Sequence, residues 1–373
     1  MTRSDRTWRP ATRRRAVCAA ALGLGVLSAA PAAAETFDWQ YATFITGNSA
    51  LTIPVREWVE SWDEQSEHDV NVEFFFQQAL LQATEVLPGV ADGRAAMGQT
   101  TTLYHPAETP LSQVVGIPFV TQDIEAEARA FNELYETNEA YRAEWDALGL
   151  HVITFVPIAG NVFGTTFPVE TLSDLEGKRI RAAGLLSGAV EEAGATPVAM
   201  PAPEIYQALE RGILDGWTAN PFEITIKLGW HKVSPYYTDG GTGMFNLNVL
   251  IMNQETWEQV PDDLKELIEE TRDDYLTRHV TYTIEQEEVA CRQLLEEGGT
   301  PYVLPEEEIA RWQEMVGDAP LEQWKQDVAA RGVAEDVAQQ FYDEYRAALA
   351  KYEQTSQYQT PPTERCVELA EQG

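Results

Sequence analysis

Hydrophobic positions along the chain follow two spacings, one typical of strands and the other of helices. Short apolar runs bounded by polar or turn residues predict buried strands. Between them, Leu51, Val55, Trp58 and Trp62 recur at helical spacing and predict an amphipathic helix. This alternation is typical of an α/β protein. The predicted strands cover residues 37–42, 70–76, 95–102, 150–156, 162–166, 178–181 and 249–252.

A long helix is predicted to begin at Pro261, because Leu264, Ile268, Thr271 and Tyr275 keep helical spacing and the pattern continues past residue 288. A helix over 125–148 is expected to end at a glycine, and a terminal helix covers 337–348. Further helices are predicted over 83–93, 187–193 and 203–212.

Residues 1–34 have the pattern of a secretory signal peptide. Six arginines precede an apolar run of about 15 residues, which is shorter than the roughly 20 needed to span a bilayer. The run ends in an A-x-A type cleavage site near Ala34/Glu35. We expect the mature protein to begin there and to be periplasmic, without stable membrane insertion. Export by the general or the twin-arginine route remains open.

The composition is strongly acidic. The 373 residues carry 60 acidic and 26 basic side chains, a formal net charge of −34. Loss of six Arg and one Asp with the signal peptide leaves 59 acidic and 20 basic side chains, a net charge of −39. A surface this negative repels nucleic acids and anionic membranes. We interpret the acidity as an adaptation to high external salt, which screens charge repulsion.

Two cysteines remain after the signal peptide is removed, Cys291 and Cys366. In an oxidising compartment this even number predicts a disulfide, with two unpaired buried thiols as the alternative.

Motifs for catalysis are missing from the sequence. It contains neither a G-x-S-x-G nor an H-E-x-x-H motif, and its five histidines are scattered. The glycine-rich segment 240–243 lacks the lysine of a phosphate-binding loop. These observations disfavour an enzyme, a metal centre and a cofactor, although a hydrolase with an unrecognised site remains an alternative.

The segment from Asn161 to Glu223 combines cations, amides and an indole, which suits binding of a small molecule. Strand alternation places Arg179 and Arg181 on one face, where one can meet solvent and the other a cleft. An arginine fork matches a carboxylate, with a surface ion pair as the alternative. Trp217 and Asn220 follow a predicted helix, in a loop suited to ligand contacts. Core packing is the alternative for Trp217.

Three motifs in this part of the chain resemble those of the extracytoplasmic solute-binding proteins of TRAP transporters. Residues 171–181 (TLSDLEGKRIR) are similar to the family's D-L-x-G-x-K-[IVL]-R block. Residues 194–198 (GATPV) and 203–216 (PEIYQALERGILDG) match a second block, and 252–264 (MNQETWEQVPDDL) match a third. The resemblance covers about residues 37–300.

The resemblance implies a two-lobed venus-flytrap α/β fold with a long helix bridging the lobes. The implied division is a signal peptide (1–34), mainly lobe 1 (35–155), mainly lobe 2 (156–255), then the bridging helix and C-terminal helices (256–373). The resemblance also implies capture of a small organic acid and its delivery to TRAP membrane permease subunits. We expect a monomer.

Arg181 falls on the family's carboxylate-binding arginine. Asn161 replaces a second arginine found in some sugar-acid binders, and the loop DGWTANP (215–221) is one residue longer than usual and lacks the family's Glu. Members that use a metal carry an acidic residue in this loop, so a bound metal is not expected, although Glu223 lies close.

We expect the ligand carboxylate to dock on Arg181. Asn161 and Asn220 are predicted to hydrogen-bond its polar groups, and Trp217 and Phe163 to pack over its carbon skeleton. Asn48, Thr101 and Tyr104 are candidates to close over it from the first lobe. A periplasmic sensor component would use the same binding chemistry and remains an alternative, and an ABC importer subunit is disfavoured by the motifs.

Overall fold

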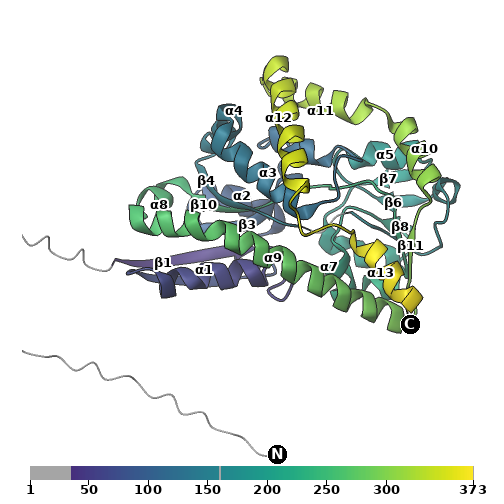
Figure 1. Ribbon diagram of the computed structural model, residues 1–373, viewed down its shortest axis with the longest axis horizontal. Helices are drawn as coiled ribbons and strands as arrows, with labels where there is room; N and C mark the ends of the chain where they lie inside the picture. Colours follow the sequence, from purple (N-terminus) through teal and green to yellow (C-terminus); the bar gives the residue numbers. More distant parts are fainter. Residues whose placement is uncertain (1–34, 159–160, 373) are drawn as a thin grey trace, which may run out of the picture. The chain divides into compact units, whose positions relative to one another are not determined.

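The computed structural model describes residues 35–158 and 161–372, so the predicted signal peptide lies outside the described part. Strands and helices alternate along the chain, as predicted, and build two separate sheets (Figure 1). None of the helices in the described part is both long and apolar enough to cross a membrane.

The first sheet has five strands in the order β2-β1-β3-β10-β4. The β1 strand runs parallel to β2 and β3, whereas β10 is antiparallel to β3 and β4. Every residue of the central strands β3 and β10 is buried, as expected for strands covered on both faces. The strands are β1 (Thr36–Thr43), β2 (Asp69–Phe75), β3 (Met97–Thr101), β4 (Leu150–Val156) and β10 (Asn248–Asn253).

The second sheet has six short strands in the order β11-β9-β5-β8-β6-β7. Two of them, β5 and β6, lie within strands predicted over 162–166 and 178–181, whereas β7, β8, β9 and β11 were not predicted; all six have two to four residues, which show little of a period. The strands are β5 (Phe163–Thr165), β6 (Arg179–Arg181), β7 (Thr196–Val198), β8 (Gly216–Trp217), β9 (Tyr236–Asp239) and β11 (Thr300–Val303).

Helices pack on both sheets, and the largest hydrophobic core includes buried residues of both, such as Phe155 and Leu250 of the first sheet and Phe163 and Ile180 of the second. On the first sheet, α1 contacts β2, α2 contacts β3, and α3 contacts β4; on the second, α5 contacts β7 and α13 contacts β9 and β11. These and the remaining helices are α1 (Ile53–Gln65), α2 (Val86–Ala91), α3 (Ile124–Thr137), α4 (Glu139–Asp146), α5 (Leu186–Glu192), α6 (Ile205–Glu210), α7 (Phe222–Lys227), α8 (Gln254–Glu258), α10 (Glu306–Val316), α11 (Ala319–Ala330), α12 (Glu335–Glu353) and α13 (Pro362–Gln372). Short 3-10 helices are η1 (Ala83–Glu85), η2 (Thr102–Tyr104), η3 (Leu111–Gly116), η4 (Leu172–Leu175), η5 (Ala202–Glu204) and η6 (Trp230–Lys232).

The helix α9 (Asp262–Glu296) has 35 residues and contacts elements of both sheets (Figure 1). It begins after Pro261, as predicted, and the two aspartates of its first turn favour its positive end. On the side of the first sheet, the rings of Tyr275 and Trp58 of α1 stack at 4.4 Å. Further along, the Gln286 side chain accepts a hydrogen bond from Lys227 of α7 at 3.0 Å. The predicted lobe-bridging helix is therefore present.

A disulfide between Cys291 and Cys366 links the C-terminal helix α13 to α9, as predicted from the cysteine count. Beside it, the buried Glu287 carboxylate accepts a hydrogen bond from Tyr358 at 3.0 Å and forms an ion pair with Arg365 of α13. The helix predicted over 337–348 is present as α12, which runs from Glu335 to Glu353, and α13 follows it.

The single helix predicted over 125–148 is two helices, α3 and α4, separated at Asn138. The Asn138 backbone leaves the helical region, with φ −99° and ψ 112°, and its side chain accepts a hydrogen bond from the Tyr141 amide at the start of α4. The asparagine thus caps the second helix.

The strand β10 departs from the predicted division into lobes. Residues 156–255 were assigned mainly to lobe 2, yet β10 lies between β3 and β4 in the first sheet. The chain therefore returns from β9 to β10 through residues 240–247, so the second lobe's continuous segment ends before residue 248.

Candidate ligand-binding site

A cavity of about 380 Å³ is lined by elements of both lobes. The volume lies near the lower end of the roughly 300–1,000 Å³ typical of ligand sites. Aromatic side chains form much of the wall, and of the described residues that line it only Arg181 carries a charge. The aromatic residues are Phe44, Tyr104, Tyr206, Trp230 and Phe245; neutral polar groups include Thr46, Gln77, Gln78, Asn220, Asn246 and Asn248.

Arg181 ends strand β6, and its side chain is among the largest fully buried ones in the protein, with 1% of its surface exposed. Its Nε donates a hydrogen bond to the Met200 carbonyl, and its Nη1 donates to the carbonyls of Thr218 and Ala219, each at 3.0 Å. Its Nη2 has no hydrogen-bond partner among the described residues. The guanidinium is thus held in one orientation while part of its fork stays free.

The charge of Arg181 has no neutralising carboxylate in the part of the chain that the structure describes. No carboxylate of the described residues forms an ion pair with it, and burial lowers the pKa of its guanidinium, an effect opposed by Tyr104. Because an arginine remains protonated even when buried, the cavity holds an uncompensated positive charge. This arrangement can accept one carboxylate, whose oxygens match the guanidinium fork.

The loop 218–220 positions Arg181 and is itself held by Asn161. The Asn161 side-chain oxygen accepts hydrogen bonds from the Thr218 hydroxyl and the Ala219 amide, both at 2.5 Å. Ala219 has a positive φ of 60°, which is strained for a residue with a Cβ. The hydrogen bonds to Asn161 and Arg181 hold the loop in this strained conformation.

Four predicted site residues come together in the cavity wall. Arg181 and Asn220 line it from the second lobe, and Thr101 and Tyr104 line it from the first. The Tyr104 hydroxyl accepts a hydrogen bond from the Ala202 amide at 3.5 Å, which joins the two lobes, and burial raises the pKa of this tyrosine against the opposing effect of Arg181.

Trp217 and Phe163 lie in the hydrophobic core instead of the cavity wall. Trp217 is fully buried between Trp230 and Tyr237, and its Nε1 donates a hydrogen bond to the Ser234 hydroxyl at 2.9 Å. Its indole lies against Gly164, where an added Cβ would come within 2.1 Å of the ring. Phe163 packs on Trp312, with 5.5 Å between the centres of the two rings.

Asn161 and Asn48 do not line the cavity either. The Asn161 amide nitrogen donates to the Thr242 hydroxyl at 2.6 Å, so the whole carboxamide is used to hold neighbouring chain segments. Asn48 is exposed, and its carbonyl accepts a hydrogen bond from Lys227 of α7 at 2.9 Å. Their predicted contacts with a ligand are therefore replaced by contacts within the protein.

Glu223 is buried in α7 and does not line the cavity. Neither carboxylate oxygen has a hydrogen-bond partner among the described residues, and burial raises its pKa to about 7 in spite of the nearby Lys227. No group of three or more His, Cys, Asp or Glu side chains in the described part is arranged to hold a metal ion. The structure thus gives Glu223 no metal-binding neighbours.

Several wall residues were missed by sequence reasoning. Tyr206 was assigned to the apolar stripe of a predicted helix, where nothing separates a core side chain from a cavity side chain. Phe245, Asn246 and Asn248 come together with Thr101 only because β10 pairs beside β3. The available signal was the pair of asparagines and one phenylalanine in the segment 244–248 (MFNLN), which follows the glycines of 240–243.

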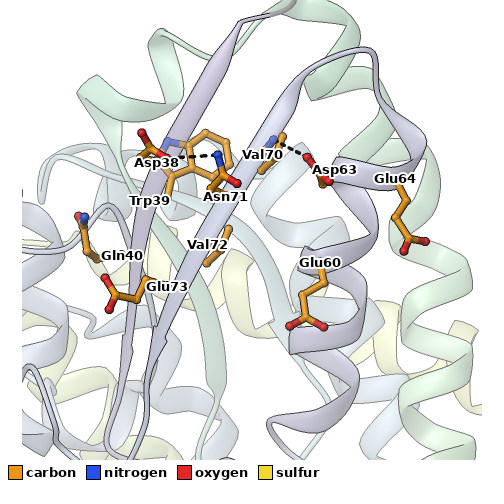
Figure 2. A pocket seen from close by; sticks show the side chains of 10 residues that line it. All are labelled: Asp38, Trp39, Gln40, Glu60, Asp63, Glu64, Val70, Asn71, Val72 and Glu73. Carbon is orange, nitrogen blue, oxygen red and sulfur yellow. Dashed lines mark hydrogen bonds between the residues drawn. The ribbon is translucent and has the colours of Figure 1, made fainter. Parts of the chain in front are cut away.

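A second hollow, of about 520 Å³, lies over α1, β1 and β2 (Figure 2). Five carboxylates line it, and Asp63 and Asp38 accept hydrogen bonds from the Val70 amide and the Asn71 side chain. Its negative charge would repel an organic anion, so the Arg181 cavity is the better candidate site for one.

The fold and the Arg181 cavity are those of a solute-binding protein, and the chain belongs to the bacterial extracellular solute-binding protein family 7 (DctP), whose family model matches residues 41–327.

Individual relatives support this membership. The ectoine-binding periplasmic protein TeaA of Halomonas elongata is 24% identical over 66% of this chain and 73% of its own length. The C4-dicarboxylate-binding periplasmic protein DctP of Rhodobacter capsulatus is 23% identical over 81% of this chain and 92% of its own.

Solved structures share the fold. A TRAP periplasmic solute-binding protein from Desulfovibrio salexigens is 26% identical, with a TM-score of 0.73, and covers 86% of this chain and 98% of its own. A TRAP solute-binding protein from Rhodoferax ferrireducens, in complex with copurified benzoate, is 22% identical, with a TM-score of 0.76. The match covers 86% of this chain and 99% of the Rhodoferax chain. The predicted family and two-lobed fold are confirmed.

Proposed function

We propose that this protein is the extracytoplasmic subunit of a TRAP transporter and that it captures a small organic acid by its carboxylate at Arg181. The observation that carries the proposal is the buried, uncompensated guanidinium in a cavity shared by two lobes. A ligand carboxylate would supply the missing negative charge. Because water is excluded around the ion pair, ligands without a carboxylate would bind much more weakly.

The relatives support a carboxylate ligand. Their names describe the binding of ectoine, C4-dicarboxylates, 2,3-diketo-L-gulonate and monocarboxylate 2-oxoacids, and solved relatives hold benzoate, mandelate or galacturonate. The proposed role is binding without turnover, followed by delivery to membrane permease subunits. Consistent with the family, we place the protein in the periplasm, as a monomer.

Binding is proposed to favour closure of the two lobes. Tyr104 and Asn48 of the first lobe already contact Ala202 and Lys227 of the second. A ligand held by Arg181 and touched by both walls would add contacts available only in the closed arrangement and so shift the population towards it.

Arg181→Met is expected to weaken carboxylate binding by about 100-fold or more, because it removes one member of a buried charge pair. Isothermal titration calorimetry against benzoate, mandelate, succinate, pyruvate and ectoine measures this, after circular dichroism has shown that the variant is folded. Arg181→Lys keeps the charge but not the fork, and should retain an intermediate affinity.

Arg179→Met is the matched control, since Arg179 lies two residues away on the same strand but is exposed and paired with Asp215 at 2.8 Å. The affinity of the Arg179→Met variant for these carboxylates should equal that of the wild type. Equal binding by the wild type and Arg181→Met would contradict the proposed function.

A further inference from the structure

Asn246 lies in the cavity wall on the segment 240–247 that connects the two sheets. The backbone is fixed on both sides of it, since the Met244 amide donates to the Thr121 carbonyl at 2.9 Å and the Leu247 carbonyl accepts from the Thr102 amide at 3.0 Å. These two hydrogen bonds hold the backbone on either side of Asn246 against Thr121 and Thr102.

The side-chain oxygen of Asn246 is buried and has no hydrogen-bond partner within residues 35–158 and 161–372. Only 6% of the residue is exposed, and its Oδ1 accepts no hydrogen bond from any described residue. The other asparagines in the wall differ: Asn248 accepts from the Gln99 side chain at 2.6 Å, and Asn220 donates to the Thr218 carbonyl at 3.2 Å. A buried acceptor that stays unpaired is costly, so a ligand that fills the cavity must bring a donor to it.

The rest of the wall limits the ligand to one charge. Arg181 supplies the single cation among the described wall residues, and none of them is acidic. A second ligand carboxylate would lack a cation, and a ligand ammonium would lack a carboxylate. The aromatic side chains around Arg181 offer flat apolar surfaces that suit a ring.

We propose that Asn246 is a specificity-determining residue that accepts a hydrogen bond from a ligand hydroxyl, and that the ligand class is the hydroxylated cyclic monocarboxylates. This inference rests on the proposed function, because the carboxylate is taken to dock on Arg181. Binding sites built to pair a substrate hydroxyl discriminate strongly against analogues that lack it.

The experiment compares matched acids with and without a hydroxyl. Benzoate is measured against 2-, 3- and 4-hydroxybenzoate, and phenylacetate against mandelate, by calorimetry with the wild type and Asn246→Leu. We expect at least one hydroxylated acid to bind the wild type about tenfold more tightly than its parent or better. Asn246→Leu should abolish this preference and leave the parent acid within about twofold.

Asn71→Leu, an exposed asparagine in β2, is the matched control and should keep the preference. If parent and hydroxylated acids bind equally well, or if Asn246→Leu weakens both equally, the inference is wrong while Arg181-dependent binding stands. If none of these acids binds, the inference is again wrong. If, in addition, Arg181→Met leaves the binding of every carboxylate in the wider panel unchanged, the proposed function fails with it.

Discussion

Arg179 and Arg181 show how two identical side chains, two residues apart on one strand, take different roles. Arg179 meets Asp215 through two hydrogen bonds of 2.9 and 2.8 Å and holds the pKa of that carboxyl below its ordinary value. Arg181 is buried without a carboxylate and faces the cavity. Alternation along the strand predicts one face for both, but only Arg181 is buried and hydrogen-bonded to the carbonyls of the loop 218–220.

Trp217→Phe tests the position of the indole in the core. The change removes the hydrogen bond to Ser234 and leaves a cavity between Trp230 and Tyr237, so the free energy of unfolding should fall by about 2–3 kcal/mol. Ligand affinity should change by less than about twofold, since the ring does not line the cavity. Urea denaturation and calorimetry measure the two effects, and a large loss of affinity without destabilisation would contradict the assignment.

The candidate site could be predicted only in part from the sequence. Arg181, Asn220, Thr101 and Tyr104 line the cavity, and the family motif was the guide for Arg181; their contacts with a ligand stay a prediction. Trp217 was placed in the wall by its loop position. Residue type alone does not distinguish an indole over a ligand from one that packs on Gly164, because burial depends on segments far apart in the chain.

At the scale of elements, prediction succeeded where the apolar period was long. The helix that follows Pro261 spans nearly ten turns, so the helical spacing of its apolar residues was easily recognised. The break at Asn138 was missed because both flanking helices continue the same apolar period, and a capping asparagine is also tolerated within a helix. The short strands of the second sheet carry no period of their own.

Removal of the disulfide between α9 and α13 should lower stability. The link joins residues separated by 75 positions, and its loss in the double variant Cys291→Ala and Cys366→Ala should cost about 3–4 kcal/mol of unfolding free energy. Urea denaturation measures the change. Wild-type protein under reducing conditions is the control and should match the variant; identical midpoints for oxidised and reduced protein would contradict the expectation.

The buried Glu223 of α7 should make stability depend on pH. Burial raises its pKa from an ordinary 4.5 to about 7 in the folded protein, so the folded state holds a proton that the unfolded chain releases between these values. Its contribution is therefore complete below pH 4.5 and is lost as the pH rises through 7. Glu223→Gln cannot ionise and should exceed the wild type by on the order of 3 kcal/mol at pH 8 while differing little at pH 4.5.

Denaturation curves between pH 4.5 and 8.5 measure this difference. Glu269→Gln, an exposed residue of α9, is the control and should follow the wild type at every pH. If Glu223→Gln were less stable than the wild type at pH 8, the prediction would be wrong. The Glu223 carboxylate would then be ionised in the folded protein and stabilised there by a cation or a hydrogen-bond donor.

At the scale of the whole molecule, charge repulsion should make stability depend on salt. Residues 35–373 carry 59 acidic and 20 basic side chains, and in molar salt the screening length falls to about 3 Å. We therefore expect the melting temperature to rise by several degrees between 0.1 and 2 M NaCl. Sucrose at matched osmolality controls for preferential exclusion, and a falling melting temperature in NaCl would contradict this view of the acidity.

The position of β10 also determines the order in which the protein can fold. The first sheet needs residues 248–253 between β3 and β4, so the first 150 or so residues to emerge during synthesis lack the strand that joins their sheet. Every strand of the second sheet except β11 is made before that strand arrives. The first sheet can therefore be completed only after residue 253 has been made, through contacts of long sequence separation, which slow folding.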